Sequence, residues 1–238
     1  MKKLIFKIIK ITLIIATIIL AYIVISGYVM YKMAVSNISV AEKVEKIKSR
    51  ENYDGNISDY FYNAVISIED NRFETHNGFD LKSFLRANLE NLKRGELYTG
   101  GSTITQQLAK NMYFTSKKKL SRKVAELFVV HELEKKYSKR DIFNLYVNII
   151  YYGDGYTGIK EASLGYFNQL PKDLNLYNAS LLAGILPAPS SYELSNNNVA
   201  TFSRQYLVLN AMYLYKKINK SEYKENADIV DIYISRED

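Results

Sequence analysis

Apolar and polar positions recur along most of this chain with the three-to-four-residue period of amphipathic helices. The start of the chain departs from that pattern, because lysines within residues 1–10 precede an uncharged, mostly apolar run from Ile11 to Tyr31. A helix of that length crosses a bilayer core of about 30 Å. The sequence therefore predicts a basic N-terminus at 1–10, one transmembrane helix at 11–31, and further helices after it.

The apolar run also carries information about orientation. Secretory signal peptides have apolar segments of roughly 7 to 15 residues that end at a small-residue cleavage site. The run here is longer and no such site follows it, so we expect an uncleaved anchor, with a cleaved signal peptide as the alternative. Lysines on the N-terminal side predict a cytoplasmic N-terminus and place the chain after about Lys32 outside the cytoplasm.

The remaining pattern predicts a mainly α fold. Residues 32–56 are charged and mildly amphipathic, as expected of a stalk or linker; the folded domain is expected at 57–218, and residues 219–238 form a weakly patterned tail. Helices are expected from the Ser58 cap to near Glu69, and over Leu81–Leu97, Thr103–Asn111, Ser121–Tyr137, Ser138–Ile149, Ile159–Phe167, Leu176–Leu186 and Phe202–Ile218.

The composition of the chain limits the kinds of partner and site that it can have. The 238 residues are 47% hydrophobic, enough for a sizeable core, and the formal charge is +7 with a pI near 9.2. That charge favours an anionic partner such as a phospholipid surface, a phosphate-bearing substrate or nucleic acid, and an extracytoplasmic location removes nucleic acid. The absence of cysteine excludes a thiolate nucleophile and a Cys-ligated zinc, and two histidines do not favour a multi-histidine metal site.

One stretch has the features of a polar binding element. Gly100 and Gly101 precede a Thr103-x-x-Gln106 pair that is typical of a capping box, and a short amphipathic helix follows. Thr103, Gln106, Gln107 and Lys110 share one face by spacing, and Ile104 and Leu108 share another. A helix N-terminus with a lysine one to two turns later suits an anionic, hydroxyl-rich ligand. An ordinary capped surface helix is the alternative.

Two acidic positions have chemical interest. Glu69 is expected at the end of a helix, where the negative dipole end disfavours a carboxylate and raises its proton affinity, a property that suits a general base or acid. Solvated helix-end charges are the alternative. Arg122 and Glu126 are four apart and are most simply a surface ion pair. The glycines at 153, 155 and 158 match a dinucleotide-binding pattern but follow a predicted helix, so we reject that function.

Three motifs resemble those of the peptidoglycan glycosyltransferases of glycosyltransferase family 51, in the monofunctional, membrane-anchored form. They are Glu69-Asp70-x-x-Phe73-x-x-His76-x-Gly78-Phe79-Asp80, the stretch Gly100–Asn111, and Arg122-Lys123-x-x-Glu126, in the family's order. The resemblance covers roughly residues 57–218. It implies a lysozyme-like helical lobe with a smaller membrane-proximal lobe after one transmembrane helix.

The resemblance also implies a reaction. Lipid II is polymerised when the 4-hydroxyl of an acceptor sugar attacks the anomeric carbon of a donor and polyprenyl diphosphate leaves. By motif position Glu69 is the general base, and Lys110, Arg122 and Lys123 neutralise the diphosphate. Glu126 is the second catalytic acid, which would orient those cations, hold a divalent metal, or assist the leaving group. The other implied substrate-binding residues are Asp70, Phe73, His76, Ser102, Thr103, Gln106, Gln107 and Asn111.

Partners follow from the same resemblance. Lipid II, the growing glycan strand and membrane lipids are expected, and the basic, apolar segment Leu81–Leu97 suits lipid headgroups. Cell-wall synthesis proteins are candidate partners, a divalent cation (Mg²⁺ or Mn²⁺) is a candidate cofactor, and no organic cofactor is expected. The sequence contains no transpeptidase motif, so crosslinking is not expected. The alternatives are a lysozyme-like lytic enzyme and a catalytically silent wall-binding protein.

Overall fold

The computed structural model describes residues 2–95, 100–114, 120–196 and 199–235. Over these residues the chain is helical, and the only β-type pairing among them is an isolated bridge between Tyr151 and Thr157. The helices are α1 (Lys2–Val35), α2 (Val40–Lys48), α3 (Asp59–Glu69), η1 (Phe73–Thr75), α4 (Leu81–Arg94), α5 (Ile104–Tyr113), α6 (Leu120–Lys136), α7 (Lys139–Val147), α8 (Ile159–Phe167), η2 (Pro171–Asp173), α9 (Leu176–Ile185), η3 (Leu194–Asn196), α10 (Val199–Leu214) and α11 (Lys220–Ile234).

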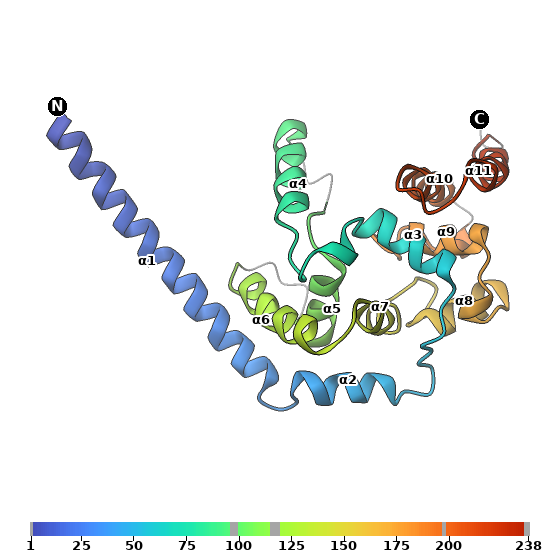
Figure 1. Cartoon of the computed structure of the whole chain (residues 1–238), viewed down its shortest axis with the longest axis horizontal. Coiled ribbons are helices and arrows are strands. Elements are labelled where there is room, and N and C mark those ends of the chain that lie inside the picture. The colour runs from blue at the N-terminus through green and yellow to red at the C-terminus, as the bar shows by residue number, and fades with distance from the viewer. Residues whose placement is uncertain (1, 96–99, 115–119, 197–198, 236–238) are drawn as a thin grey trace.

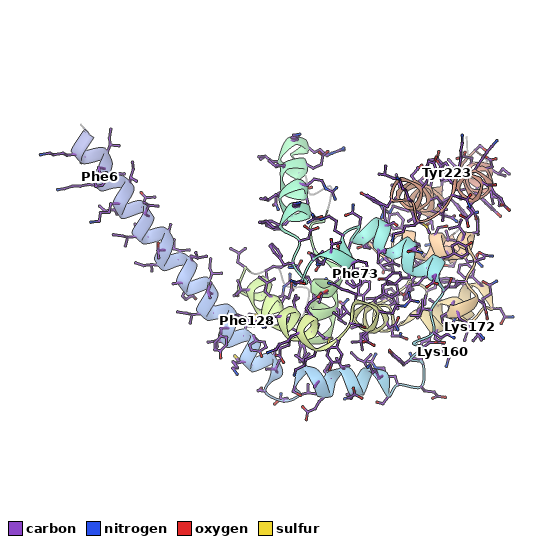
Figure 2. The ribbon with its side chains drawn as sticks, viewed as in Figure 1. Phe6, Phe73, Phe128, Lys160, Lys172 and Tyr223 are labelled. Atoms are coloured by element: carbon purple, nitrogen blue, oxygen red, sulfur yellow. The ribbon has the colours of Figure 1, made fainter. Side chains whose placement is uncertain are left out.

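The first helix is long and apolar enough to cross a membrane, which fits the predicted anchor. It runs without a break from Lys2 to Val35, four residues beyond the predicted end, and leaves the rest of the molecule at a steep angle (Figure 1). Its N-terminal part is exposed on all sides, and Phe6 projects into open space (Figure 2). Its C-terminal part packs along α6, where Phe128 lies beside it (Figure 2).

The segment expected to be a stalk contains a helix that belongs to the body. Ser39 and Glu42 form a capping box that begins α2. Val40, Val44 and Ile47 then recur on one face and are at most 1% exposed in the main core. Charged residues lie between these three positions, so the sequence pattern indicates an amphipathic helix but does not show that its apolar face is buried in the core.

Two groups of helices form the body around α3. On one side α3 packs against α9 and α10, and on the other α5 packs against α6 and α7. Aromatic rings join the groups, since Phe143 of α7 contacts both Phe61 and Tyr62 of α3 at ring-centroid distances of 6.3 and 4.6 Å. Buried residues from both groups make one continuous core. The mainly α fold with one apolar N-terminal helix is confirmed.

Helix α4 stands away from this body (Figure 1). Asp80 caps its start by accepting from the backbone N–H of Ser83, and Gly95 ends it in the left-handed region at a φ of 70°. Ala87 is its one buried residue, and its leucines are half exposed or more. The predicted end of this helix at Leu97 lies outside the described residues. An exposed face that is both apolar and basic fits the expected membrane-proximal element.

The C-terminal segment is also folded where the sequence predicted only a weakly patterned tail. Asn219 and Glu222 form a capping box that begins α11, and Ala227 and Val230 are buried against the body. The last predicted helix, Phe202–Ile218, corresponds to α10, which starts and ends a few residues earlier. With α11 packed on α10, the body extends well past residue 218.

Candidate active site

A cleft of about 930 Å³ lies between the two groups of helices. Residues from the end of α3, from α5, from the start of α6 and from α10 line it, together with the segment after α9. Eight predicted site residues come together on its walls: Glu69, Ser102, Gln106, Gln107, Lys110, Asn111, Arg122 and Lys123. Residues more than 50 positions apart in sequence therefore form a single site.

Glu69 is the last residue of α3, as predicted, and its carboxylate faces the cleft. Burial raises the pKa of this carboxyl above its ordinary value, and the neighbouring Asp70 carboxylate adds to the rise. A hydrogen bond from Gln107 and the charge of Arg204 oppose it without cancelling it. The direction agrees with the sequence argument, but the main cause is loss of solvent rather than the helix dipole.

Gln107 fixes the orientation of Glu69. Its side-chain Nε2 donates to Glu69 Oε2 at 2.9 Å, and its Oε1 accepts from the hydroxyl of Tyr146 at 2.9 Å. Because Tyr146 is 2% exposed and can only donate in this contact, it holds the Gln107 amide with the NH₂ toward the carboxylate. One oxygen of Glu69 is thereby held, and its other oxygen has no hydrogen bond among the described residues.

Three cations lie on the wall formed by α5 and α6. Lys110, Arg122 and Lys123 all line the cleft. Lys123 Nζ lies 3.1 Å from Ser102 Oγ and 2.9 Å from Glu126 Oε2, and an Arg122 N–H donates to Glu126 Oε1. Within the described part of the chain, no carboxylate pairs with Lys110. The wall suits a multiply charged anion such as a diphosphate.

Glu126 corrects one expectation. The Arg122–Glu126 contact is not a surface ion pair, because Glu126 is 0% exposed and Arg122 is 9% exposed. The carboxylate does not line the cleft but lies behind the two cations and aims them into it. A buried carboxylate between two cations is a strong constraint on their positions, since removing it would leave unpaired buried charge.

The same geometry bears on the predicted divalent metal. In residues 2–95, 100–114, 120–196 and 199–235, no three acidic or histidine side chains cluster as metal ligands would. Both oxygens of Glu126 already face cations. Mg²⁺ and Mn²⁺ prefer several oxygen ligands around one position. A Mg²⁺ or Mn²⁺ ion at Glu126 stays an untested prediction, and this donor set does not favour it.

Four further predicted binding residues make contacts that hold the site together. Asp70 accepts from His76 Nε2 at 2.9 Å and from the backbone N–H of Ile104 at 3.0 Å. Thr103 donates to the carbonyl of Gly78 at 2.6 Å and forms the predicted capping box with Gln106. Phe73 is 1% exposed in the core. None of the four lines the main cleft, and their contacts position α3 and α5 relative to each other. Asp70 and Thr103 also line an adjoining cavity of about 320 Å³, which Glu69 and Ser102 share.

Sequence reasoning missed part of the cleft. Arg204 on α10 lies close enough to Glu69 to lower its pKa, and Tyr146, Tyr151 and Tyr192 line the same space. No local sequence pattern marks Arg204 as a site residue. Spatial proximity to Glu69 arises only when α10 packs against α3.

The glycine-rich turn closes one wall. Gly153, Gly155 and Gly158 all have φ values between 85° and 90°, where a side chain is strained. A Cβ at Gly153 would lie 2.9 Å from Glu193 and 3.0 Å from the carbonyl of Pro189. Gly153 therefore allows the segment that carries Tyr192 to pack against this turn, and the positive φ values of all three glycines explain the pattern without a nucleotide.

Comparison with known proteins gives this geometry its context. The transglycosylase family model matches residues 36–213. The chain belongs to this family of peptidoglycan glycosyltransferases. It is 35% identical over 200 residues to a monofunctional glycosyltransferase of Staphylococcus epidermidis, covering 79% of this chain and 74% of that protein. A monofunctional glycosyltransferase of Staphylococcus haemolyticus is 34% identical over 206 residues, covering 84% and 76%.

A longer relative is also similar. Penicillin-binding protein 1A of Pseudomonas aeruginosa is 38% identical over 164 residues, which is 69% of this glycosyltransferase chain, but the match spans only 20% of that protein. The family match begins at residue 36, just after α1, and so includes α2. That boundary agrees with the packing of α2 in the core.

Proposed function

We propose that the cleft polymerises lipid II, with Glu69 as the general base. Glu69 removes the proton from the 4-hydroxyl of the acceptor sugar as that oxygen attacks the anomeric carbon of the donor. The bond between the anomeric carbon and the diphosphate oxygen breaks, and polyprenyl diphosphate leaves with the electron pair. The partly buried carboxylate, held by Gln107 and raised in pKa, matches what such a base requires.

The leaving diphosphate gains negative charge in the transition state. Lys110, Arg122 and Lys123 face the cleft, and Glu126 holds two of them, Arg122 and Lys123, in place before substrate arrives. Preorganised cations at the position of developing charge stabilise the transition state more than the ground state. The proposal rests on one observation, that a single cleft contains a carboxyl group with a raised pKa and three cationic side chains.

The surroundings support a membrane-borne substrate. Helix α1 is long and apolar enough to span a bilayer, and α4 exposes an apolar and basic face. We infer that the N-terminus is cytoplasmic and the domain extracytoplasmic, because lysines at positions 3, 7 and 10 precede the apolar run. A lipid carrier keeps its diphosphate at the bilayer surface, within reach of a domain held there. Partner proteins of cell-wall synthesis remain a further proposal.

Purified lipid II in detergent tests the reaction. The parent protein is expected to make long glycan strands and to release one polyprenyl diphosphate per linkage formed, and Glu69→Gln to make at least 100-fold less. Glu74→Gln is the matched control, since Glu74 is a nearby carboxylate on η1 that does not line the cleft. If the parent leaves lipid II untouched and shortens preformed glycan, a lytic activity replaces this proposal. If it binds glycan without altering either substrate, the silent wall-binding alternative holds.

A further inference from the structure

The C-terminal part of α1 is joined to the helix that carries the cations. Gly27 is buried, and a Cβ there would lie 2.5 Å from the Cβ of Val124 on α6 and 3.0 Å from the carbonyl of Ser121. Contacts that close exclude every residue except glycine unless a helix shifts. Small residues are what allow helix backbones to approach in this way. Arg122 and Lys123 lie between the two α6 residues that Gly27 touches.

The two helices run in the same direction. Gly27 meets α6 at Ser121 and Val124, whereas Tyr31 stacks on Phe128 at 5.3 Å and donates to Glu132 at 2.5 Å. Later residues of α1 thus meet later residues of α6. The N-terminal turns of α6, which hold the cations, therefore lie at the end nearest the lipid-spanning part of α1.

The exposure pattern places the membrane surface at the same level. Residues 3–22 of α1 are all exposed, Ile23 and Ser26 are half-buried, and Gly27 is the first buried residue. Residues 11–26 carry no charge and rise about 24 Å as a helix, close to the bilayer core once Lys10 extends toward the headgroups. Tyr28 and Lys32 follow, with the Lys32 ammonium 5.7 Å from the Tyr28 ring, a combination suited to a membrane interface.

We propose that α1 is a rigid strut that sets the height of the diphosphate-binding cations above the bilayer, and that Gly27 is the positioning residue for this contact. Helix α1 is continuous from its lipid-facing part to Gly27, the residue that meets Val124 of α6. No hinge therefore separates the anchor from the helix that carries Arg122 and Lys123. The lipid-linked diphosphate then meets Arg122 and Lys123 at headgroup level. This inference rests on the proposed function, because it concerns the same substrate and the same cations.

The first test exchanges the two side chains at the contact. Gly27→Val is expected to lower lipid II polymerisation in proteoliposomes at least tenfold, while in detergent micelles, where no bilayer fixes the height, it stays within about threefold of the parent. Adding Val124→Gly, which gives back the space, is expected to restore most of the bilayer rate. Ala21→Val, a similar enlargement at an exposed α1 position, is the control and is expected to change neither rate.

A second test changes the height without touching the contact. Deleting residues 14–17 shortens the lipid-facing part of α1 by about 6 Å. The deletion is expected to shift the lipid composition of maximal activity toward thinner bilayers and to leave the micelle rate unchanged. A strut that did nothing but stabilise the fold would give no such shift.

The outcomes separate the two proposals. Failure of the parent to polymerise lipid II in either medium overturns the proposed function itself. A parent that is active while Gly27→Val matches it in bilayers, or loses activity equally in micelles without rescue by Val124→Gly, overturns the strut. An unchanged thickness optimum after the deletion overturns it independently, even if Gly27→Val folds poorly.

Discussion

The side chains proposed for catalysis lie on two sides of one cleft. Glu69 sits on the α3 side with Gln107 and Tyr146 behind it, and the cations sit on the α5 and α6 side with Glu126 behind them. Glu69, Arg122 and Lys123 thus each have a partner that fixes the direction of the side chain, whereas no described carboxylate holds Lys110. Such support holds the proposed base and two of the three proposed diphosphate-binding cations in a preorganised geometry.

Neutralising one cation tests the diphosphate wall. Lys110→Met removes a charge that no described carboxylate balances, so it is expected to lower kcat about 100-fold or more because the leaving diphosphate loses a cationic partner. The comparison is made by steady-state polymerisation of lipid II. Lys172→Met is the control, because Lys172 lies on the far side of the body (Figure 2) and should leave the rate unchanged. Equal losses in both variants would point to net charge rather than to the site.

Removing one hydroxyl tests the support of the base. Tyr146→Phe deletes the donor that holds the Gln107 amide, and it is expected to lower kcat roughly tenfold with little change in KM, the loss of about one hydrogen bond. Tyr152→Phe is a matched control, since that buried tyrosine donates to the carbonyl of Val147 and makes no contact with Gln107. An equal change in kcat for both variants would contradict the role of the Tyr146 hydroxyl in orienting Gln107 toward Glu69.

Local sequence was enough to mark several residues that line the cleft but not all of their neighbours there. Glu69, Gln107 and Lys110 lie in or beside helix-end and capping patterns that a single sequence displays. Arg204 and Tyr192 have no local pattern, and they reach the cleft only through the packing of α10 and the turn at Gly153. Phe73 and His76 belong to a motif, yet a motif does not tell whether a side chain faces substrate or core.

Between helices, a small polar cluster joins the end of α3 to the start of α5. Asp70 accepts from His76 and from Ile104, and the Lys139 ammonium donates to the carbonyl of His76 at 2.6 Å. Lys139 also lies 4.7 Å from the ring centroid of Phe73. The cluster ties three helices together directly behind Glu69.

Breaking this cluster is expected to weaken the fold. Asp70→Ala leaves His76 and the N–H of Ile104 without their acceptor in a site that is 6% exposed, so the free energy of unfolding should fall by about 2–4 kcal/mol. Denaturant unfolding in detergent measures it. Asp59→Ala removes an exposed carboxylate at the first residue of α3, the helix that Asp70 follows, and should stay within about 0.5 kcal/mol of the parent. A similarly small effect at Asp70 would contradict the positioning role.

The sequence predicts where helices begin better than it predicts which helices pack against each other. The capping residues Ser58, Thr103 and Ser138 begin helices as expected, because a cap satisfies backbone N–H groups locally. The burial of α2 and α11 was not predictable, since their apolar stripes are short and lie among charges. What covers such a stripe depends on residues far away in sequence.

In the whole molecule, the arrangement of α1, α4 and the cleft indicates a protein that binds its substrate at a bilayer surface. Helix α4 exposes Leu89 at 58% and Leu92 at 79%, and basic residues flank them. Hydropathy alone indicated an anchor, but not that its last turns pack against α6. That contact depends on the absence of a side chain at Gly27, which no periodicity reveals.

Lipid contact by α4 is testable in the intact protein. Changing Leu89 and Leu92 to Gln is expected to raise KM for lipid II in proteoliposomes roughly tenfold with a smaller change in kcat, because two large apolar side chains no longer favour the bilayer. Leu164→Gln with Leu170→Gln, two half-exposed leucines elsewhere on the body, is the matched control. An unchanged KM in bilayers would mean that α4 does not dock on lipid.

The pH dependence of kcat/KM for lipid II polymerisation tests the central claim most directly. Because Glu69 must be ionised to accept a proton and its pKa is raised, the rate should fall as the pH drops through a pKa above the ordinary glutamate value of about 4.3. Glu69→Gln should lose that limb together with most of the rate. A limb at the ordinary value, or one that survives in Glu69→Gln, would contradict Glu69 as the base.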